Sequence, residues 1–252
     1  MTRILVTNDD GVRSPGIKAL QSALGRFGEV TVVAPMREAS AIGHALTLYH
    51  PLRLEELGDG RYGVEGTPTD CVNIAIARVL GGRPDLLVSG INKGLNVGDD
   101  VTYSGTVAGA LEGALLGVPS LAVSLDYRAK AENDFGLAAE TAAHLAGLVL
   151  ERGLPARTFL NVNVPRGEVK GYRVTVQAKR NHITSVTERR DPKGRPYYWI
   201  GESMDEWEPS DRSDYQAIKD GYVSVTPLHP DMTAYDAVKV VAGFGLERPP
   251  VS

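Results

Sequence analysis

The sequence predicts an α/β fold built on a mostly parallel sheet, with a β-rich extension toward the C-terminus. Up to about residue 125, short apolar runs rich in β-formers alternate with segments of helical periodicity, which is the pattern of parallel strands joined by crossover helices. Beyond residue 158, strand-like runs follow one another with little helix between them. The 252 residues are 42% apolar, an ordinary share for a globular protein with a full core.

Short apolar runs mark the expected strands. In the first half of the chain, each run has the length and the composition of a buried parallel strand. Turn-forming residues end two of them, since Pro35 stops the second run and Gly90 the third. The expected strands cover residues 4–7, 30–34, 86–89 and 119–125, and in the second half 159–164, 172–178, 197–200 and 222–226.

Helix signals lie between these runs. Residues 16–27 carry apolar side chains at three- and four-residue spacing, which predicts an amphipathic helix. Thr67 and Pro68 supply a capping residue and a proline at the first helical position of a second helix. Ser104 opens a third, and residues 133–151 form a long fourth helix.

Residues 179–214 differ from the rest of the chain. They carry 7 basic and 8 acidic side chains, a turn signal at 191–194, and both tryptophans, Trp199 and Trp207. A segment this charged cannot bury itself alone, so two interpretations stay open: a protruding hairpin whose aromatic side chains pack on a neighbouring subunit, or a solvated surface excursion. The expected divisions are a main domain at 1–178, the charged hairpin at 179–214, and a final segment at 215–252 that returns to the core or to a partner subunit.

Composition excludes several classes of protein. A single Cys cannot form an internal disulfide, which excludes a disulfide-stapled secreted module. No stretch approaches about 18 consecutive apolar residues, and the first residues lack the apolar run of a signal peptide, so we expect a cytoplasmic protein without a membrane partner. The net charge of −4, from 27 Lys and Arg against 31 Asp and Glu, argues against a stable nucleic-acid partner.

Two adjacent carboxylates follow the first predicted strand, in the run Asn8-Asp9-Asp10-Gly11. In an open α/β sheet, ligands bind beyond the carboxyl ends of the strands, so a site is expected here. Neighbouring carboxylates repel each other unless a cation lies between them, and Mg²⁺ or Mn²⁺ prefers such oxygen ligands. The alternative is that these four residues form only a turn.

A second polar segment, residues 89–100, directly follows another predicted strand. Its glycines permit close approach of the backbone to a ligand, while Asn92 and Asn96 offer amides and Lys93 offers a cation. Ordinary loops also collect glycine and asparagine, so the segment alone does not define a site.

Two further segments can contribute polar groups. The run Ser104-Gly105-Thr106 opens a helix, where free N–H groups and the helix dipole favour an anion such as phosphate. Ser40 and His44 follow the second strand and can reach the same region, although a lone histidine is also typical of a hydrogen-bonded loop.

The coincidence of these segments points to chemistry. Three of them follow strands of one predicted sheet and the fourth caps a helix at the same edge, which together supplies carboxylates, neutral oxygens, a cation and amides. The combination suits metal-assisted phosphoryl chemistry. Competing motifs are absent: no G-x-G-x-x-G follows the first strand, no Walker-type Lys-Ser/Thr follows the glycines at 11 and 16, and neither G-x-S-x-G nor H-E-x-x-H occurs.

Several motifs, in order from residue 3 to about residue 240, resemble the SurE family of stationary-phase survival nucleotidases (survival protein E). The resemblance implies a three-layer, Rossmann-like fold with a C-terminal extension that exchanges elements within a dimer. The motifs are ILVTNDDG at 4–11, VAP at 33–35 with Ser40, GTPTDCV at 66–72, VSGIN at 88–92 with Gly94 and Asn96, YSGT at 103–106 and GYVSVTPL at 221–228.

The same resemblance implies the activity and its cofactor. It implies a phosphomonoesterase that hydrolyses nucleoside 5′- and 3′-monophosphates to nucleoside and phosphate, with polyphosphate as a further substrate of some members. It also implies one divalent cation per subunit, Mg²⁺ or Mn²⁺, and a homodimer or homotetramer, which we expect to form through residues 179–214. Carried over by position, the metal ligands are Asp9, Asp10, Ser40 and Asn92.

The resulting hypothesis makes Asp9 and Asp10 catalytic, one of them orienting the attacking water as base. Two alternatives stay open: a covalent aspartyl-phosphate phosphatase with one of these residues as nucleophile, and a non-catalytic module that binds nucleotides through a metal. Contacts to the substrate or its phosphate are expected from Asn8, Gly43, His44, Asn96, Ser104, Gly105 and Thr106, with Lys93 as a further donor.

Overall fold

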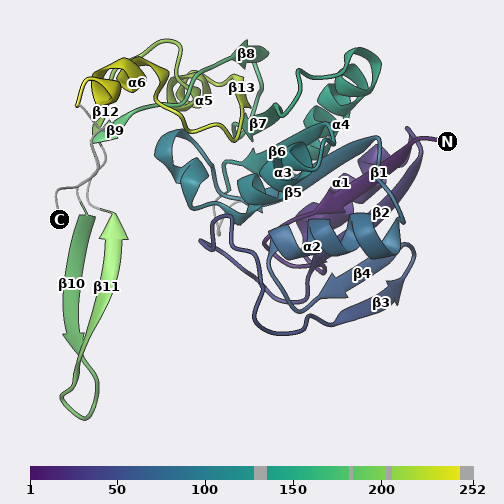
Figure 1. Ribbon diagram of the computed structural model, residues 1–252, viewed down its shortest axis with the longest axis horizontal. Helices are drawn as coiled ribbons and strands as arrows, with labels where there is room; N and C mark the ends of the chain where they lie inside the picture. Colours follow the sequence, from purple (N-terminus) through teal and green to yellow (C-terminus); the bar gives the residue numbers. More distant parts are fainter. Residues whose placement is uncertain (128–134, 182–183, 203–205, 245–252) are drawn as a thin grey trace.

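A nine-stranded sheet forms the centre of the computed structural model, which describes residues 1–127, 135–181, 184–202 and 206–244 (Figure 1). The strands are β1 (Arg3–Thr7), β2 (Glu29–Pro35), β3 (Leu54–Gly58), β4 (Arg61–Val64), β5 (Leu86–Lys93), β6 (Ser120–Leu125), β7 (Phe159–Val164), β8 (Tyr172–Val174) and β13 (Val223–Leu228). Their order is β3-β4-β2-β1-β5-β6-β7-β13-β8, and the six from β4 to β7 are parallel. The predicted α/β class is therefore confirmed.

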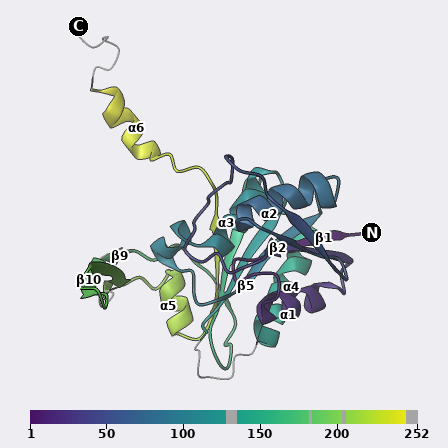
Figure 2. The same cartoon turned by 90° about the horizontal axis from the view of Figure 1, so that it is seen from below.

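Helices cover both faces of the sheet, which produces three layers (Figure 2). On one face lie α1 (Pro15–Leu24) and α4 (Phe135–Arg152), and on the other lie α2 (Pro68–Ile74), its π-helical continuation η1 (Ala75–Val79) and α3 (Gly105–Leu115). Alternate residues of β1 serve the two sides, because successive side chains of a strand point to opposite faces. Ile4 and Val6 join the core under α1 and α4, whereas Leu5 packs with the side chains of α2.

Two of the predicted helix starts are confirmed by their capping residues. Thr67 caps α2 through a capping box with Asp70, and Ser104 caps α3 by accepting a hydrogen bond from Val107 N at 3.1 Å. The first helix ends at Leu24, earlier than predicted, because the chain turns at Gly25. The long helix is confirmed from Phe135 to Arg152, and the predicted residues 133–134 lie outside the described residues.

The strand predicted to end at Gly90 continues instead to Lys93. Gly90 adopts φ +140°, and the register with β6 shifts between Gly90 and Asn92. Such a bulge lets the strand continue past an irregular residue that only glycine occupies without strain. Asn92 and Lys93 consequently stand on the end of β5 rather than in a free loop.

Other elements were not predicted from the sequence. The hairpin of β3 and β4 extends one edge of the sheet, and the helices α5 (Asp214–Lys219) and α6 (Tyr235–Ala242) lie in the part expected to be rich in strands. Three valines in α6 favour a strand by propensity, which explains why its helical structure was missed. The strand predicted over 172–178 reaches only Val174.

The charged segment does contain a protruding hairpin, formed by β10 (Thr184–Arg190) and β11 (Pro196–Glu202) and separated from the main body in Figure 1. Its turn lies at the predicted position, where Gly194 N donates to Asp191 O at 2.8 Å. Trp199 is exposed on β11. Trp207, in the short strand β12 (Glu206–Trp207) that pairs with β9 (Arg180–Asn181), instead stacks on Tyr215 of the same chain at 4.5 Å between ring centroids.

None of the helices in the described part of the chain combines the length and the hydrophobicity that a bilayer crossing requires.

Candidate active site

Three of the predicted polar segments leave neighbouring strands at the same edge of the sheet. β2, β1 and β5 are adjacent and parallel, so the residues after Thr7, after Pro35 and at Lys93 come together at the carboxyl ends of these strands. These ends form the carboxyl edge of the sheet. The N-terminus of α3 lies at this edge as well, because its second residue contacts Asp9. The convergence expected from a parallel sheet is therefore present.

Asp9 connects the first strand with the start of α3. Its side chain is buried and accepts two hydrogen bonds from Thr106, from the backbone N at 3.1 Å and from Oγ1 at 2.5 Å. A Cβ on Gly105 would lie only 2.8 Å from Asp9 Cβ, so the absence of a side chain there lets the helix approach the carboxylate. Asp9 O also accepts a hydrogen bond from Ala39 N at 2.8 Å, which places the Ser40 loop beside it.

Asp10 is paired with the end of β5. Its Oδ2 accepts a hydrogen bond from Lys93 N at 3.2 Å, and its Oδ1 lies 3.3 Å from Lys93 Nζ. The side chain of Asp10 is largely enclosed, whereas that of Lys93 reaches solvent. A flexible cation beside Asp10 can exchange this ion pair for a contact with an anionic ligand.

Both carboxyl groups resist ionisation. Burial raises the pKa of Asp9, and the charge of Asp10 raises it further, although the bonds from Thr106 oppose the shift. Burial also raises the pKa of Asp10, with Lys93 opposing and the nearby Glu38 adding to the increase. A cation placed between the two carboxylates would reverse this direction, because it favours the ionised forms.

The remaining predicted ligands supply neutral oxygens. Ser40 Oγ donates to Glu38 Oε1 at 2.7 Å, and its lone pairs face no donor among the described residues. Asn92 Nδ2 donates to Gly94 O at 3.0 Å, which leaves the side-chain oxygen as an acceptor. Within the described ranges, no group of three or more His, Cys, Asp or Glu side chains could hold a metal. Two carboxylates, from Asp9 and Asp10, together with the neutral oxygens of Ser40 and Asn92 are a donor set whose chemistry fits Mg²⁺ or Mn²⁺.

Some predicted phosphate contacts already have protein partners. The amide and the hydroxyl of Thr106 both bind Asp9, and Ser104 Oγ caps α3. Asn8 is fully buried and donates from Nδ2 to Gly11 O at 3.1 Å and to Ser14 Oγ at 2.9 Å. These bonds stabilise the turn after β1, so direct contact of Asn8 with a substrate stays a prediction.

Asn96 lies inside a network of asparagines. Its Nδ2 donates to Ser124 Oγ at 2.7 Å, and its backbone N donates to Asn163 Oδ1 at 2.8 Å. Asn96 O accepts hydrogen bonds from the side chains of Asn161 and Asn163. The network anchors the loop after β5 to β6 and β7, and a role of Asn96 in phosphate binding stays a prediction.

Gly43 and His44 belong to a loop that is anchored at several points. Gly43, at φ +59°, donates from its N to Tyr103 O at 2.9 Å. His44 Nε2 lies 2.7 Å from Oε2 of Glu112, whose Oε1 accepts a hydrogen bond from Asn73 at 2.7 Å. Burial opposes ionisation of Glu112, but the hydrogen bonds from His44 and Asn73 together lower its pKa.

Sequence reasoning missed the two acids that hold this loop. Asp70 accepts hydrogen bonds from Thr47 N at 2.8 Å and from Thr47 Oγ1 at 2.7 Å, and Glu112 binds His44. The available signal for Glu112 was its position as the single charged residue of an otherwise small and apolar helix segment, 105–115. A buried charge at such a place normally has a partner.

Comparisons with known proteins agree with this fold. The family described as Survival protein SurE matches residues 4–184. The chain belongs to the SurE family. The 5′-nucleotidase SurE of Geotalea daltonii is 52% identical over 242 residues, covering 95% of this chain and 97% of the relative, and that of Pelobacter propionicus is 54% identical over 241 residues, covering 94% and 97%. The crystal structure of the SurE protein from Aquifex aeolicus superimposes with a TM-score of 0.87 at 44% identity, covering 98% of this chain and 100% of that one.

Membership in the SurE family confirms the resemblance and the three-layer fold inferred from the sequence.

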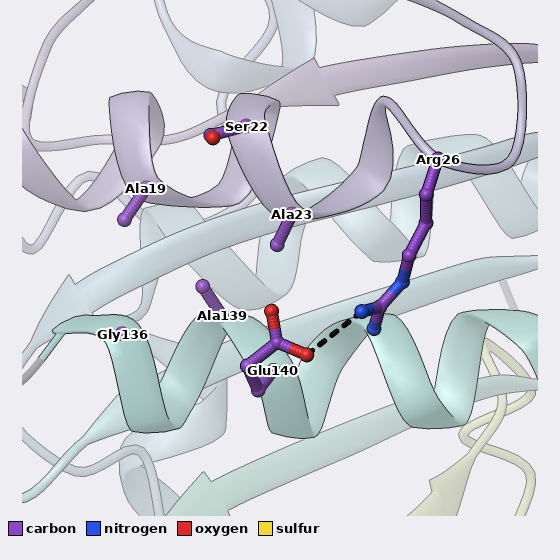
Figure 3. Close-up of a pocket in the computed structure, with 7 residues that line it drawn as sticks. All are labelled: Ala19, Ser22, Ala23, Arg26, Gly136, Ala139 and Glu140. Atoms are coloured by element: carbon purple, nitrogen blue, oxygen red, sulfur yellow. Dashed lines mark hydrogen bonds and ion pairs between the residues drawn. The ribbon is translucent and has the colours of Figure 1, made fainter.

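A surface crevice of about 450 Å³ lies elsewhere, between α1 and α4, and Figure 3 shows small side chains facing each other across it. Its charged groups, Arg26 and Glu140, form an exposed ion pair at 2.8 Å. With both charges paired and no carboxylate pair, this crevice lacks the chemistry of the carboxyl edge.

Proposed function

We propose that this SurE-family chain is a divalent-metal-dependent phosphomonoesterase that hydrolyses nucleoside 5′- and 3′-monophosphates to nucleoside and phosphate, with polyphosphate as a further substrate. The observation that carries the proposal is the pair of enclosed carboxylates, Asp9 and Asp10, at the carboxyl edge beside the N-terminus of α3. The names of the relatives, 5′-nucleotidase SurE, support the 5′-activity. The 3′-activity and the polyphosphate activity rest on the family resemblance.

The residues at the edge fit one divalent cation per subunit, Mg²⁺ or Mn²⁺. Asp9, Asp10, Ser40 and Asn92 would hold it, because they combine two carboxylates with a hydroxyl and an amide oxygen. When bound, such an ion polarises a phosphate oxygen and lowers the pKa of a water molecule. Burial raises the pKa of both Asp9 and Asp10, and a cation held between them would favour their ionised forms.

The protein groups then have distinct tasks in hydrolysis. The two bonds from Thr106 hold the carboxylate of Asp9 in one orientation, and Lys93 provides a mobile positive charge for the phosphate. The positive end of the α3 dipole points toward the same region, although the N–H groups of Thr106 and Val107 are bound to Asp9 and to Ser104 Oγ. Asp9 or Asp10 orients a water whose oxygen bonds to phosphorus while the ester bond breaks and the nucleoside oxygen takes up a proton.

A phosphate-release screen tests the proposal. Nucleoside 5′- and 3′-monophosphates are incubated with Mg²⁺ or Mn²⁺, with a chelator control and the Asp9→Asn variant. Release that requires metal and is lost in the variant supports the proposal, whereas substantial activity of the variant contradicts it. Acid quenching during a single turnover separates direct attack from an aspartyl-phosphate route, because only the latter leaves phosphate covalently bound to an enzyme carboxylate as an acyl phosphate. Metal-dependent binding without phosphate release would instead indicate a non-catalytic module.

Self-association into a homodimer or homotetramer through residues 179–214 is part of the proposal. Exposed aromatic and aliphatic side chains on β11, among them Tyr198, Trp199 and Ile200, support it, because a lone hairpin gains nothing from exposing them. The apolar residues of α6, which extends away from the body in Figure 2, offer a second such surface. Analytical ultracentrifugation of the full chain and of Trp199→Ser tests this proposal, and a monomeric wild type contradicts it. A cytoplasmic location stays a prediction.

A further inference from the structure

A cavity of about 770 Å³ runs along the outer side of α3. Its apolar floor is formed by Val107, Leu111 and Leu115 of the helix, with Phe159 from the start of β7 and Leu228 from the end of β13. The volume lies within the range of about 300–1,000 Å³ that is typical of small-molecule sites. Neither of the candidate catalytic residues, Asp9 and Asp10, lines this cavity, so catalysis alone does not explain why it is there.

The cavity begins where the proposed phosphate site ends. Ser104, the capping residue of α3, lines it, and the next two residues contact Asp9. His44 also lines it, next to Gly43, whose N–H binds Tyr103 O. A phosphate held near Asp9 and the first turn of α3 would therefore direct the rest of its molecule either into this cavity or into solvent.

The polar groups around the cavity are mostly donors and neutral acceptors. Arg157, Gln177 and His229 line it together with His44. Gln177 Nε2 donates to Gly98 O at 3.1 Å, so its side-chain oxygen is left as an acceptor. The carboxylate in the lining, Asp231, is already bound by Thr233 N and Tyr235 OH, and these hydrogen bonds lower its pKa to about 2. An apolar floor with hydrogen-bonding groups at the sides suits a flat heterocycle that carries polar edges.

We propose that this cavity holds the nucleoside part of the substrate, so that the sugar and base contact Val107 and Leu111 while the phosphate stays at the carboxyl edge. The proposal rests on the proposed nucleotidase function and extends it, because it assigns the selectivity for nucleotides over other phosphate esters to the outer side of α3. Such selectivity comes from apolar contact and from polar partners that a ligand without a base leaves unpaired.

The test replaces leucines of the cavity floor by tryptophan, so that the larger side chain fills part of the cavity. In Leu111→Trp, the indole occupies the space assigned to the base. In Leu115→Trp, the indole extends back toward Leu111, because long helical side chains lean toward the N-terminus. Leu115 is 37% exposed, so its replacement leaves the core intact. The measured quantity is the ratio of kcat/KM for adenosine 5′-monophosphate to kcat/KM for glycerol 1-phosphate. We expect the ratio to fall by roughly tenfold or more, which is the range that apolar contacts contribute to discrimination. Ser22→Trp, which introduces the same indole into the crevice of Figure 3, is the matched control and should keep the wild-type ratio.

Binding of adenosine alone separates this proposal from the proposed function. Isothermal titration with adenosine should detect binding to the wild-type chain and weaker binding to Leu115→Trp, whether or not any ester is hydrolysed. An unchanged ratio in both tryptophan variants overturns the proposal, as does a wild type that releases phosphate but does not bind adenosine. A shift in oligomeric state of the tryptophan variants with an unchanged ratio would assign the cavity to a second copy of the chain and also overturn it.

Discussion

Replacing Gly105 by alanine should reduce catalysis while leaving the chain folded. Gly105 is the first residue of α3, and a Cβ at this position would lie 2.8 Å from Asp9 Cβ, 3.0 Å from Asp9 Oδ2 and 3.3 Å from Ala39 O. The first distance is about 0.6 Å short of ordinary van der Waals contact, so the carboxylate or the helix must move. Either movement changes the position of Asp9 relative to the N-terminus of α3.

Two opposing effects set the expected size of the stability change. Alanine favours a helix over glycine by about 0.5–1 kcal/mol, whereas overpacking costs about 1–3 kcal/mol. The net loss should therefore be about 0–2 kcal/mol. Because a misplacement of about 1 Å can reduce a rate about 100-fold, we expect kcat/KM to fall by roughly 10- to 100-fold.

Gly109→Ala is the matched control. It lies on the same helix, and its Cβ would be 2.8 Å from Ser89 Oγ, the same closest approach, but its neighbours are outside the proposed site. Urea unfolding and metal-dependent phosphate release are measured for both variants. The control should lose comparable stability and keep more of kcat/KM than Gly105→Ala, because its closest contact is the Ser89 hydroxyl and not the side chain of Asp9. Wild-type kcat/KM in Gly105→Ala, or equal losses of activity in the two variants, would refute the reasoning.

Further predictions concern the carboxylates and the metal. Asp9→Asn should abolish phosphate release, and it should also abolish the rise in melting temperature on adding Mn²⁺. The variant can keep both contacts with Thr106, because the asparagine amide accepts a hydrogen bond from Thr106 N and donates one to Thr106 Oγ1. A normal Mn²⁺-induced rise would count against the ligand assignment. Chelation should remove wild-type activity, and added Mg²⁺ or Mn²⁺ should restore it; full activity in excess chelator would exclude the metal. Glu112→Gln should lower the free energy of unfolding by about 1–3 kcal/mol at pH 7. The pKa of Glu112 in the folded state is depressed below 4.5. The difference in unfolding free energy between wild type and variant should therefore persist above pH 4.5 and shrink as the pH falls through the folded-state pKa. A difference that does not change with pH in urea unfolding would contradict the assigned contacts.

Much of the fold follows from local patterns. The capping residues Thr67 and Ser104 satisfy backbone N–H groups within their own helices, so both helix starts could be read from a few adjacent residues. The continuation of β5 past Gly90 and the helical structure of α6 could not. The first depends on a bulge against β6, and the second opposes the strand propensity of its valines.

The sequence by itself determined where the candidate site lies. Asp9 and Asp10 follow one strand and Ser40 follows another, and the carboxyl ends of neighbouring parallel strands meet at one edge. This conclusion needs only the order and the direction of the strands. The residue types likewise identify the donor atoms, because two adjacent aspartates supply carboxylate oxygens. A divalent cation could therefore be expected before any geometry was known.

Only the tertiary structure decided which partner each polar group takes. Thr106 binds Asp9 across 97 positions of sequence, Glu112 binds His44 across 68, and Lys93 binds Asp10 across 83. These pairings depend on how closely α3 approaches the sheet and on how far β5 extends, and both are set by packing at glycines rather than by any local preference. The cavity beside Ser104 has the same origin, because its floor and walls come from α3, β7 and β13, which meet only after the whole sheet has assembled.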